Sequence, residues 1–178
     1  GFEPKSDFII EFKNRSVLDR WIISRFETMV QHVRDYLDDY EVSRAAKAIE
    51  NFVIEDLSNW YIRRSRRRFW KSEWDDDKRA AYYTLYEILS ELAKTVAPFI
   101  PFVAEMVYDS LYKNNIQRKE SVHLEDYPQP NPLRVDSDLL LSMEVARKMT
   151  MLGRSVRNKV NIKIRQPLSK AILVIPNQ

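Results

Sequence analysis

Apolar side chains recur at helical spacing through most of the chain. Between residues 18 and 40 they return every three or four positions, and Ser16 or Asn14 stands where a helix cap is expected. This pattern predicts a long amphipathic helix. The same spacing predicts a second helix that begins near Glu41 and continues as far as Trp70.

Two further helices are predicted between residues 75 and 113. Asp75, Asp76 and Asp77 supply a cap and favourable first-turn charges for a helix that extends to residue 96. Pro98 should end that helix, and Pro101 suits the first turn of a shorter one.

The periodicity is absent from residues 117–136, where three alternating prolines favour an extended surface strap. Helical spacing returns at residues 137–160. Residues 171–175 are rich in β-branched side chains and lie between Pro167 and Pro176, which predicts a short edge strand. The predicted fold class is therefore all-α: an up-and-down bundle of about five helices with a short C-terminal strand.

Composition narrows the candidate chemistry. The chain has no cysteine, and His32 and His123 lie far apart, so we expect neither a disulfide framework nor a metal site. It also contains no glycine-rich phosphate loop and no nucleophile elbow, so we expect no catalytic residue. No apolar run approaches the ~20 residues that span a bilayer, and we expect a cytoplasmic protein with no membrane partner.

A first basic cluster interleaves arginines with aromatic rings, a combination that suits phosphate binding and base stacking. Its candidate residues are Arg63, Arg64, Arg66, Arg67, Arg68, Trp70 and Lys71. The alternative is that several of these cations pair with Glu73, with the acidic triplet at 75–77 or with a neighbouring domain. Composition does not decide between RNA binding and protein docking.

A second basic cluster follows the last helical stripe. Its candidate residues are Arg154, Arg157, Lys159, Lys163 and Arg165. They indicate a phosphate-binding face, although a solvated face or cations that complement the helix macrodipole would produce the same pattern.

Several segments, in order, resemble the anticodon-binding domain of class I (class Ia) isoleucyl-tRNA synthetases. They are Leu-Asp-Arg-Trp-Ile-Ile-Ser-Arg at 18–25, the Trp- and Arg-rich segment at 59–70, Ala-Pro-Phe-Ile-Pro-Phe at 97–102, Ser-Val-His-Leu at 121–124 and Arg-Gln-Pro-Leu at 165–168. The resemblance implies a tRNA-binding domain whose partners are isoleucine tRNA and the catalytic domain of the same parent chain.

In that family a separate catalytic domain uses ATP and magnesium through HIGH and KMSKS motifs. Neither motif occurs here, so we expect no cofactor and no ligase activity in this chain alone. By analogy, residues 1–15 would be the tail of the catalytic domain or a linker, 16–165 the bundle, and 166–178 the start of a following module. A valine or other class Ia enzyme, or a structural helical domain that docks protein, remains the alternative.

The settings of the two basic clusters differ. The first lies among Trp60, Trp70 and Trp74, whose broad rings suit a packed interface between domains. The second begins near the end of the last predicted helix and continues into an accessible, irregular segment, so we expect it to contact tRNA phosphates.

Overall fold

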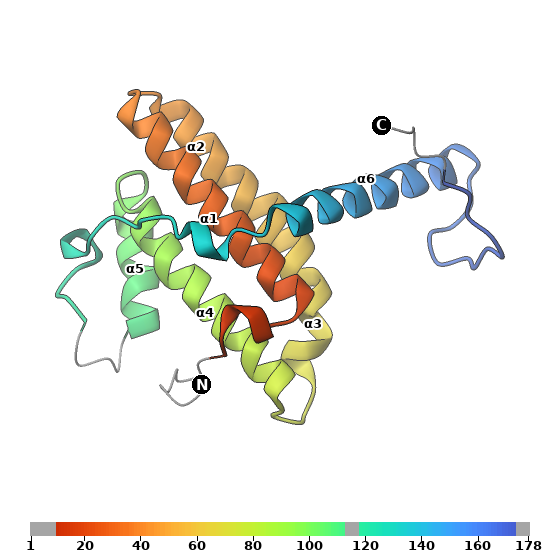
Figure 1. Ribbon diagram of the computed structural model, residues 1–178, viewed down its shortest axis with the longest axis horizontal. Coiled ribbons are helices and arrows are strands. Elements are labelled where there is room, and N and C mark those ends of the chain that lie inside the picture. Colours follow the sequence, from red (N-terminus) through yellow and green to blue (C-terminus); the bar gives the residue numbers. More distant parts are fainter. Residues whose placement is uncertain (1–9, 113–117, 174–178) are drawn as a thin grey trace. The chain divides into compact units, whose positions relative to one another are not determined.

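The computed structural model describes residues 10–112 and 118–173, and helices are the regular secondary structure found among them (Figure 1). The chain divides into two compact units, Gly1–Asp136 and Ser137–Gln178. The prediction of an all-α fold is confirmed. The predicted domain boundaries at residues 15 and 165 stay predictions.

The first helix, α1 (Val17–Asp38), begins at the predicted cap, where the Ser16 hydroxyl accepts the Asp19 N–H at 3.2 Å. Trp21, Ile22 and Val33 are almost fully buried along one side of the helix. It ends in a tight turn at Tyr40, whose φ of 60° is left-handed. The Glu41 N–H donates to the Tyr36 carbonyl at 2.7 Å across this turn, and α2 begins directly after it.

The second predicted helix is one continuous helical stretch made of three parts. These are α2 (Val42–Asn51), a π-helical segment η3 (Phe52–Ile62) and α3 (Arg63–Trp70). The backbone stays in the right-handed helical region at Phe52 and Arg63, so the predicted continuity is confirmed. The π segment was not predicted. Its wider turns change which side chains of the stretch face α1. The π segment packs against α1, and its residues Phe52, Leu57 and Tyr61 are buried.

Helices α4 (Asp76–Val96) and α5 (Pro101–Tyr112) complete the bundle of the first unit. Asp75 caps α4 by accepting the Lys78 N–H at 2.8 Å, as predicted. Helix α4 packs against α1 and α3, and α5 packs against α4 (Figure 1). The shared core places Ile88 of α4 and Tyr108 of α5 out of contact with solvent.

The strap from residue 118 to 136 crosses this bundle in irregular backbone interrupted by two short 3-10 turns, Val122–Leu124 and Pro132–Arg134. The Ser24 hydroxyl donates to the Arg134 carbonyl at 2.8 Å, and the Asn131 N–H donates to Glu27 at 2.8 Å. Nearer the start of the strap, the Tyr108 hydroxyl donates to Glu125 at 2.6 Å. The predicted irregular connection is confirmed, and these polar contacts fix its path.

The second unit contains α6 (Ser137–Lys159), followed by irregular backbone up to residue 173. The strand predicted at 171–175 is wrong for residues 171–173, which have no regular structure, while 174 and 175 lie outside the described residues. A single strand leaves its backbone polar groups unpaired, and the described part of this unit contains no second strand to pair with it.

Candidate nucleic-acid interface

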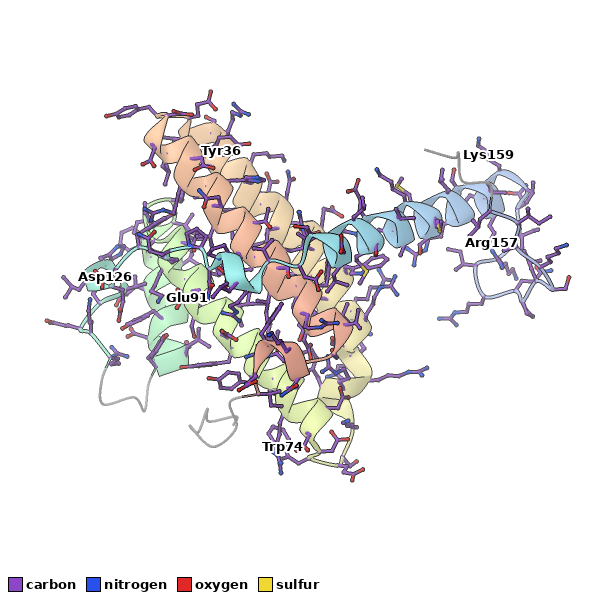
Figure 2. All side chains as sticks on the ribbon, in the orientation of Figure 1. Tyr36, Trp74, Glu91, Asp126, Arg157 and Lys159 are labelled. Atoms are coloured by element: carbon purple, nitrogen blue, oxygen red, sulfur yellow. The ribbon has the colours of Figure 1, made fainter. Side chains whose placement is uncertain are left out.

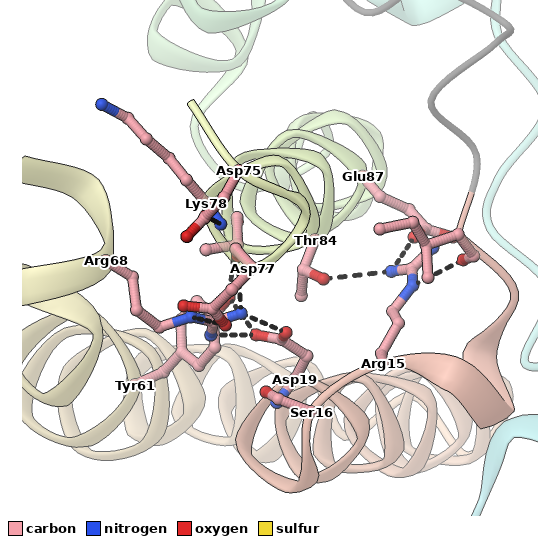
Figure 3. A network of polar contacts seen from close by, with 12 residues as sticks. Arg15, Ser16, Asp19, Tyr61, Arg68, Asp75, Asp77, Lys78, Thr84 and Glu87 are labelled. Atoms are coloured by element: carbon pink, nitrogen blue, oxygen red, sulfur yellow. Dashed lines mark hydrogen bonds and ion pairs between the residues drawn. The ribbon is translucent and has the colours of Figure 1, made fainter. Parts of the chain in front are cut away.

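Arg68 of the first basic cluster lies inside a buried polar network rather than on a binding face (Figure 3). Its two terminal nitrogens each donate to one carboxylate oxygen of Asp19 at 2.7 Å. The Tyr61 hydroxyl donates to the same carboxylate at 2.7 Å, and Arg68 Nε pairs with Asp77 at 2.8 Å. The network joins α1, the π segment, α3 and α4 at one end of the bundle.

The electrostatics of this network favour the charged pair. Burial alone would lower the pKa of Arg68, but its hydrogen bonds to Asp19 and the charge of that carboxylate outweigh burial and raise the pKa. Burial, followed by the charge of Asp19, raises the pKa of Tyr61 well above its usual value, so the phenol remains a neutral donor. Arg68 therefore stays protonated and committed to protein partners.

Lys71 is also held within the chain, because its ammonium group pairs with Asp75 and, at 3.1 Å, with Asp77. Arg68 and Lys71 therefore confirm the alternative interpretation of the first basic cluster, in which its cations pair with the acidic triplet at residues 75–77. The other candidates of this cluster remain on the surface.

Those remaining residues form an exposed face, which we call the α3 face: Arg63, Arg64, Arg66, Arg67 and Trp70. The Arg64 guanidinium lies 3.5 Å from the centre of the Trp60 ring, and that of Arg66 lies 5.1 Å from the Trp70 ring. Trp70 is 76% exposed. Stacked guanidinium and indole groups suit either an aromatic base or a protein surface, so geometry leaves both roles open.

A second network anchors the strap across α1 and α4. Arg134 of the strap pairs with Glu87 at 2.7 Å and with Glu27 at 3.3 Å. Arg15 pairs with the same Glu87 at 2.8 Å (Figure 3). Burial raises the pKa of Glu27, although the Asn131 N–H and the charge of Arg134 lower it. These contacts position the strap beside α1.

The second basic cluster lies on and just after α6, where Arg154, Lys159, Lys163 and Arg165 are exposed and Arg157 is half-buried. We call this surface the α6 face; Figure 2 labels Arg157 and Lys159 near the end of the helix. Arg157 also has an internal role, because its Nη1 donates to the Lys163 and Gln166 carbonyls at 2.9 and 2.8 Å. Arg157 therefore folds the following segment back toward the helix that carries it.

Sequence reasoning missed a groove between α1 and α2 with a volume of about 340 Å³. The lining residues are Arg25, Thr28, Met29, His32, Tyr36, Arg44, Lys47, Ala48, Asn51 and Phe52. Helical spacing places the α1 members on one side of that helix, but only the antiparallel register of the two helices brings the α2 members opposite them.

The described residues contain no group of three or more His, Asp or Glu side chains arranged to hold a metal ion. None of the described helices is long and apolar enough to cross a membrane. The chemistry that these surfaces offer consists of positive charge, hydrogen-bond donors and stacking rings.

Residues 19–172 match the family model described as the anticodon-binding domain of tRNA ligase. The chain is similar to isoleucine–tRNA ligases, with 46% identity over 99% of this chain to that of Porphyromonas gingivalis. The identity is 48% over 89% of this chain for Clostridium acetobutylicum and 41% over 92% for Thermus thermophilus. The matched part is 15–16% of the length of these relatives.

Proposed function

The chain belongs to the family of anticodon-binding domains of tRNA ligases, and from this membership we propose that it binds the anticodon arm of isoleucine tRNA. The observation that carries the proposal is the similarity to isoleucine–tRNA ligases over about nine-tenths of the chain or more. The exposed α6 face supplies the cations that such binding requires.

The proposed parent protein is an isoleucine–tRNA ligase of the cytoplasm. Its catalytic domain would use ATP and magnesium, and this chain would contribute binding energy that places the distant acceptor end of the tRNA for reaction. The partners of the chain would then be isoleucine tRNA and that catalytic domain.

We assign phosphate contact to the α6 face and domain docking to the α3 face. Support for the first assignment comes from four exposed cations on and after α6. Support for the second comes from Trp70, whose largely exposed indole would gain most from burial against protein.

A binding titration tests the proposed function. The 178-residue chain should bind an isoleucine tRNA transcript more tightly than a tRNA for another amino acid, with both measured at one salt concentration. Equal affinity for the two would contradict the proposed specificity, and no affinity for either would contradict tRNA binding. A duplex RNA with the same number of nucleotides as the tRNA transcript serves as the control for attraction by charge alone.

A further inference from the structure

Helix α6 carries a row of apolar side chains, which we call the α6 stripe. No residue of α6 is buried. Val160 directly follows the helix and continues it, because its N–H donates to the Val156 carbonyl at 3.3 Å. At ~3.6 residues per turn, the members of the stripe fall within an arc of about 100°. They are Leu141, Val145, Met149, Leu152, Val156 and Val160.

We propose that the α6 stripe binds the α6 stripe of a second copy of this chain, with the two helices antiparallel. The inference goes beyond tRNA binding and does not depend on it. The stripe from Leu141 to Val160 extends about 30 Å at ~1.5 Å per residue. All of its side chains except Met149 are between 39% and 63% exposed, so one side of α6 offers water a continuous apolar surface.

The spacing of the stripe is self-complementary. Its members follow one another at intervals of four, four, three, four and four residues, a series that reads the same from either end. A symmetric dimer uses the same surface on both copies, so its interface requires this property, whereas a partner of another sequence does not. A twofold axis between positions 150 and 151 forms three kinds of pair across the interface: Leu141 with Val160, Val145 with Val156, and Met149 with Leu152.

The charges of α6 favour the antiparallel direction. Residues 137–147 carry Asp138 and Glu144 and one cation, Arg147. Residues 148–159 contain no carboxylate and four cations, which are Lys148, Arg154, Arg157 and Lys159. A parallel pair would place the cations of both copies side by side. An antiparallel pair places them beside the half that contains both carboxylates, so charge selects the orientation.

Small residues beside the stripe allow a second helix to approach closely. Ala146 and Gly153 are two turns apart on the same side of α6, and both are exposed. A Cβ added at Gly153 would meet no atom within 4 Å, so no contact within the described residues requires glycine there. Glycine inside a helix is less favourable than alanine. The antiparallel pair would place Gly153 near Ala146 of the second copy, where small side chains shorten the distance between the helix axes.

The proposed contact leaves the phosphate-binding side of α6 accessible. Arg154 lies almost opposite the middle of the stripe around the helix, and Arg147 lies next to Arg154 on that side. Dimer formation and phosphate contact by Arg154 therefore use different sides of one helix.

The size of the stripe predicts a weak dimer. Two helices in contact over about 30 Å would bury on the order of 1,000 Å² in total, at the lower limit of specific interfaces. We expect a dissociation constant of about 10–100 μM, so monomer and dimer should coexist at concentrations that are easily reached.

Sedimentation equilibrium of the 178-residue chain tests the proposal between about 5 and 500 μM. The average mass should rise from the 21.3 kDa of the monomer toward twice that value. Leu152→Asp should abolish the rise, because it would bury an unpaired charge in the middle of the stripe. Met151→Asp is the matched control: Met151 and Leu152 are 63% and 59% exposed, but Met151 lies outside the stripe. This control should dimerise as the wild type does.

Three results would overturn the proposal. The first is a chain that stays monomeric at every concentration, which would leave the stripe to a different protein surface. The second is an average mass that continues to rise beyond that of a dimer, because aggregation has no twofold symmetry. The third is an equal loss of dimer in the Leu152→Asp and Met151→Asp variants.

Introduced cysteines test the orientation, because the chain contains none of its own. The variants Leu141→Cys and Val160→Cys are mixed in equal amounts and oxidised, and a disulfide requires two Cα atoms within about 7 Å. The antiparallel pair predicts cross-links mainly between the two different variants. Cross-links mainly between identical variants would indicate a parallel pair and overturn the proposal. Arg154→Cys is the control on the opposite side of α6 and should cross-link with neither.

Discussion

Asp19 is fully buried, and its charge is tolerated because three donors from two other side chains surround it. A carboxylate removed from water is costly unless it is paired and hydrogen-bonded, so the network must form as a unit. Arg68 thus contributes to the fold through a residue in the first turn of α1, although it belongs to a cluster whose composition indicates RNA binding.

Replacing Arg68 with alanine should lower the free energy of unfolding by about 3 kcal/mol or more, because Asp19 would remain buried without its cation. Urea denaturation measures the change. Arg67→Ala is the control, since Arg67 is exposed in the same helix, and it should change stability by about 0.5 kcal/mol or less. Equal effects of the two substitutions would contradict the structural role of Arg68.

The raised pKa of Glu27 predicts how the stability of the fold changes with pH. Because burial raises its pKa in the folded state above the usual 4.5, the folded state keeps the proton to higher pH than the unfolded state does. The favourable contribution is complete below the unfolded-state pKa and is lost as pH rises through the folded-state pKa. The unfolding free energy of the wild type relative to Glu27→Gln should therefore fall as pH rises from 4 to 7, measured by urea denaturation. A difference that rises over this interval would show that the pKa is lowered instead.

For individual side chains, the sequence indicates where the cations lie along the chain but not which groups they contact. The partner of Arg68 stands 49 positions earlier in the chain, and no local spacing links the two residues. Lys71 and its acidic neighbours lie within a few residues of one another, which is why pairing with the triplet could be foreseen as an alternative. The antiparallel register that forms the α1–α2 groove is likewise a long-range property.

Among the elements, α6 shows how two arginines one turn apart take different roles. Arg154 is exposed, whereas Arg157 donates to two carbonyls of the segment that follows the helix. We expect this segment to lose order when those hydrogen bonds are removed, because the segment packs few apolar side chains.

Arg157→Ala should therefore speed amide hydrogen exchange in residues 160–166, whereas Arg154→Ala should leave it unchanged.

Both substitutions should weaken tRNA binding, and Arg154→Ala should reduce the salt slope by about one unit through a single lost phosphate contact. The double variant Arg66→Ala, Arg67→Ala should bind tRNA as the wild type does, since we assign the α3 face to domain docking. Unchanged affinity in the α6 variants would remove the phosphate assignment from that face.

The helices themselves were largely predictable, because Ser16, Asp75, Pro98 and Pro101 act on the backbone next to them. The π segment was not predictable, because apolar spacing in a sequence does not distinguish the slightly wider turns of a short π segment from those of an α-helix. The predicted strand rested on composition at 171–175, and a strand depends on a partner that composition does not reveal.

For the whole molecule, the proposed division between tRNA binding and catalysis has a direct consequence. The 178-residue chain should not exchange pyrophosphate into ATP in the presence of isoleucine, because its sequence lacks the HIGH and KMSKS motifs of the catalytic domain. The matched control is an isoleucine–tRNA ligase that contains both motifs, assayed at equal concentration. Exchange by the chain alone would overturn this prediction.

We propose that the chain binds isoleucine tRNA through phosphate contacts, and the salt dependence of that binding is the decisive measurement. With about four exposed cations on the α6 face, the logarithm of the binding constant should fall with the logarithm of salt concentration at a slope of about −3. A transcript carrying the isoleucine anticodon should keep its advantage over a noncognate tRNA throughout the salt series. Binding that does not change with salt, or a complete absence of binding at low salt, would show that the chain does not bind tRNA through phosphate contacts.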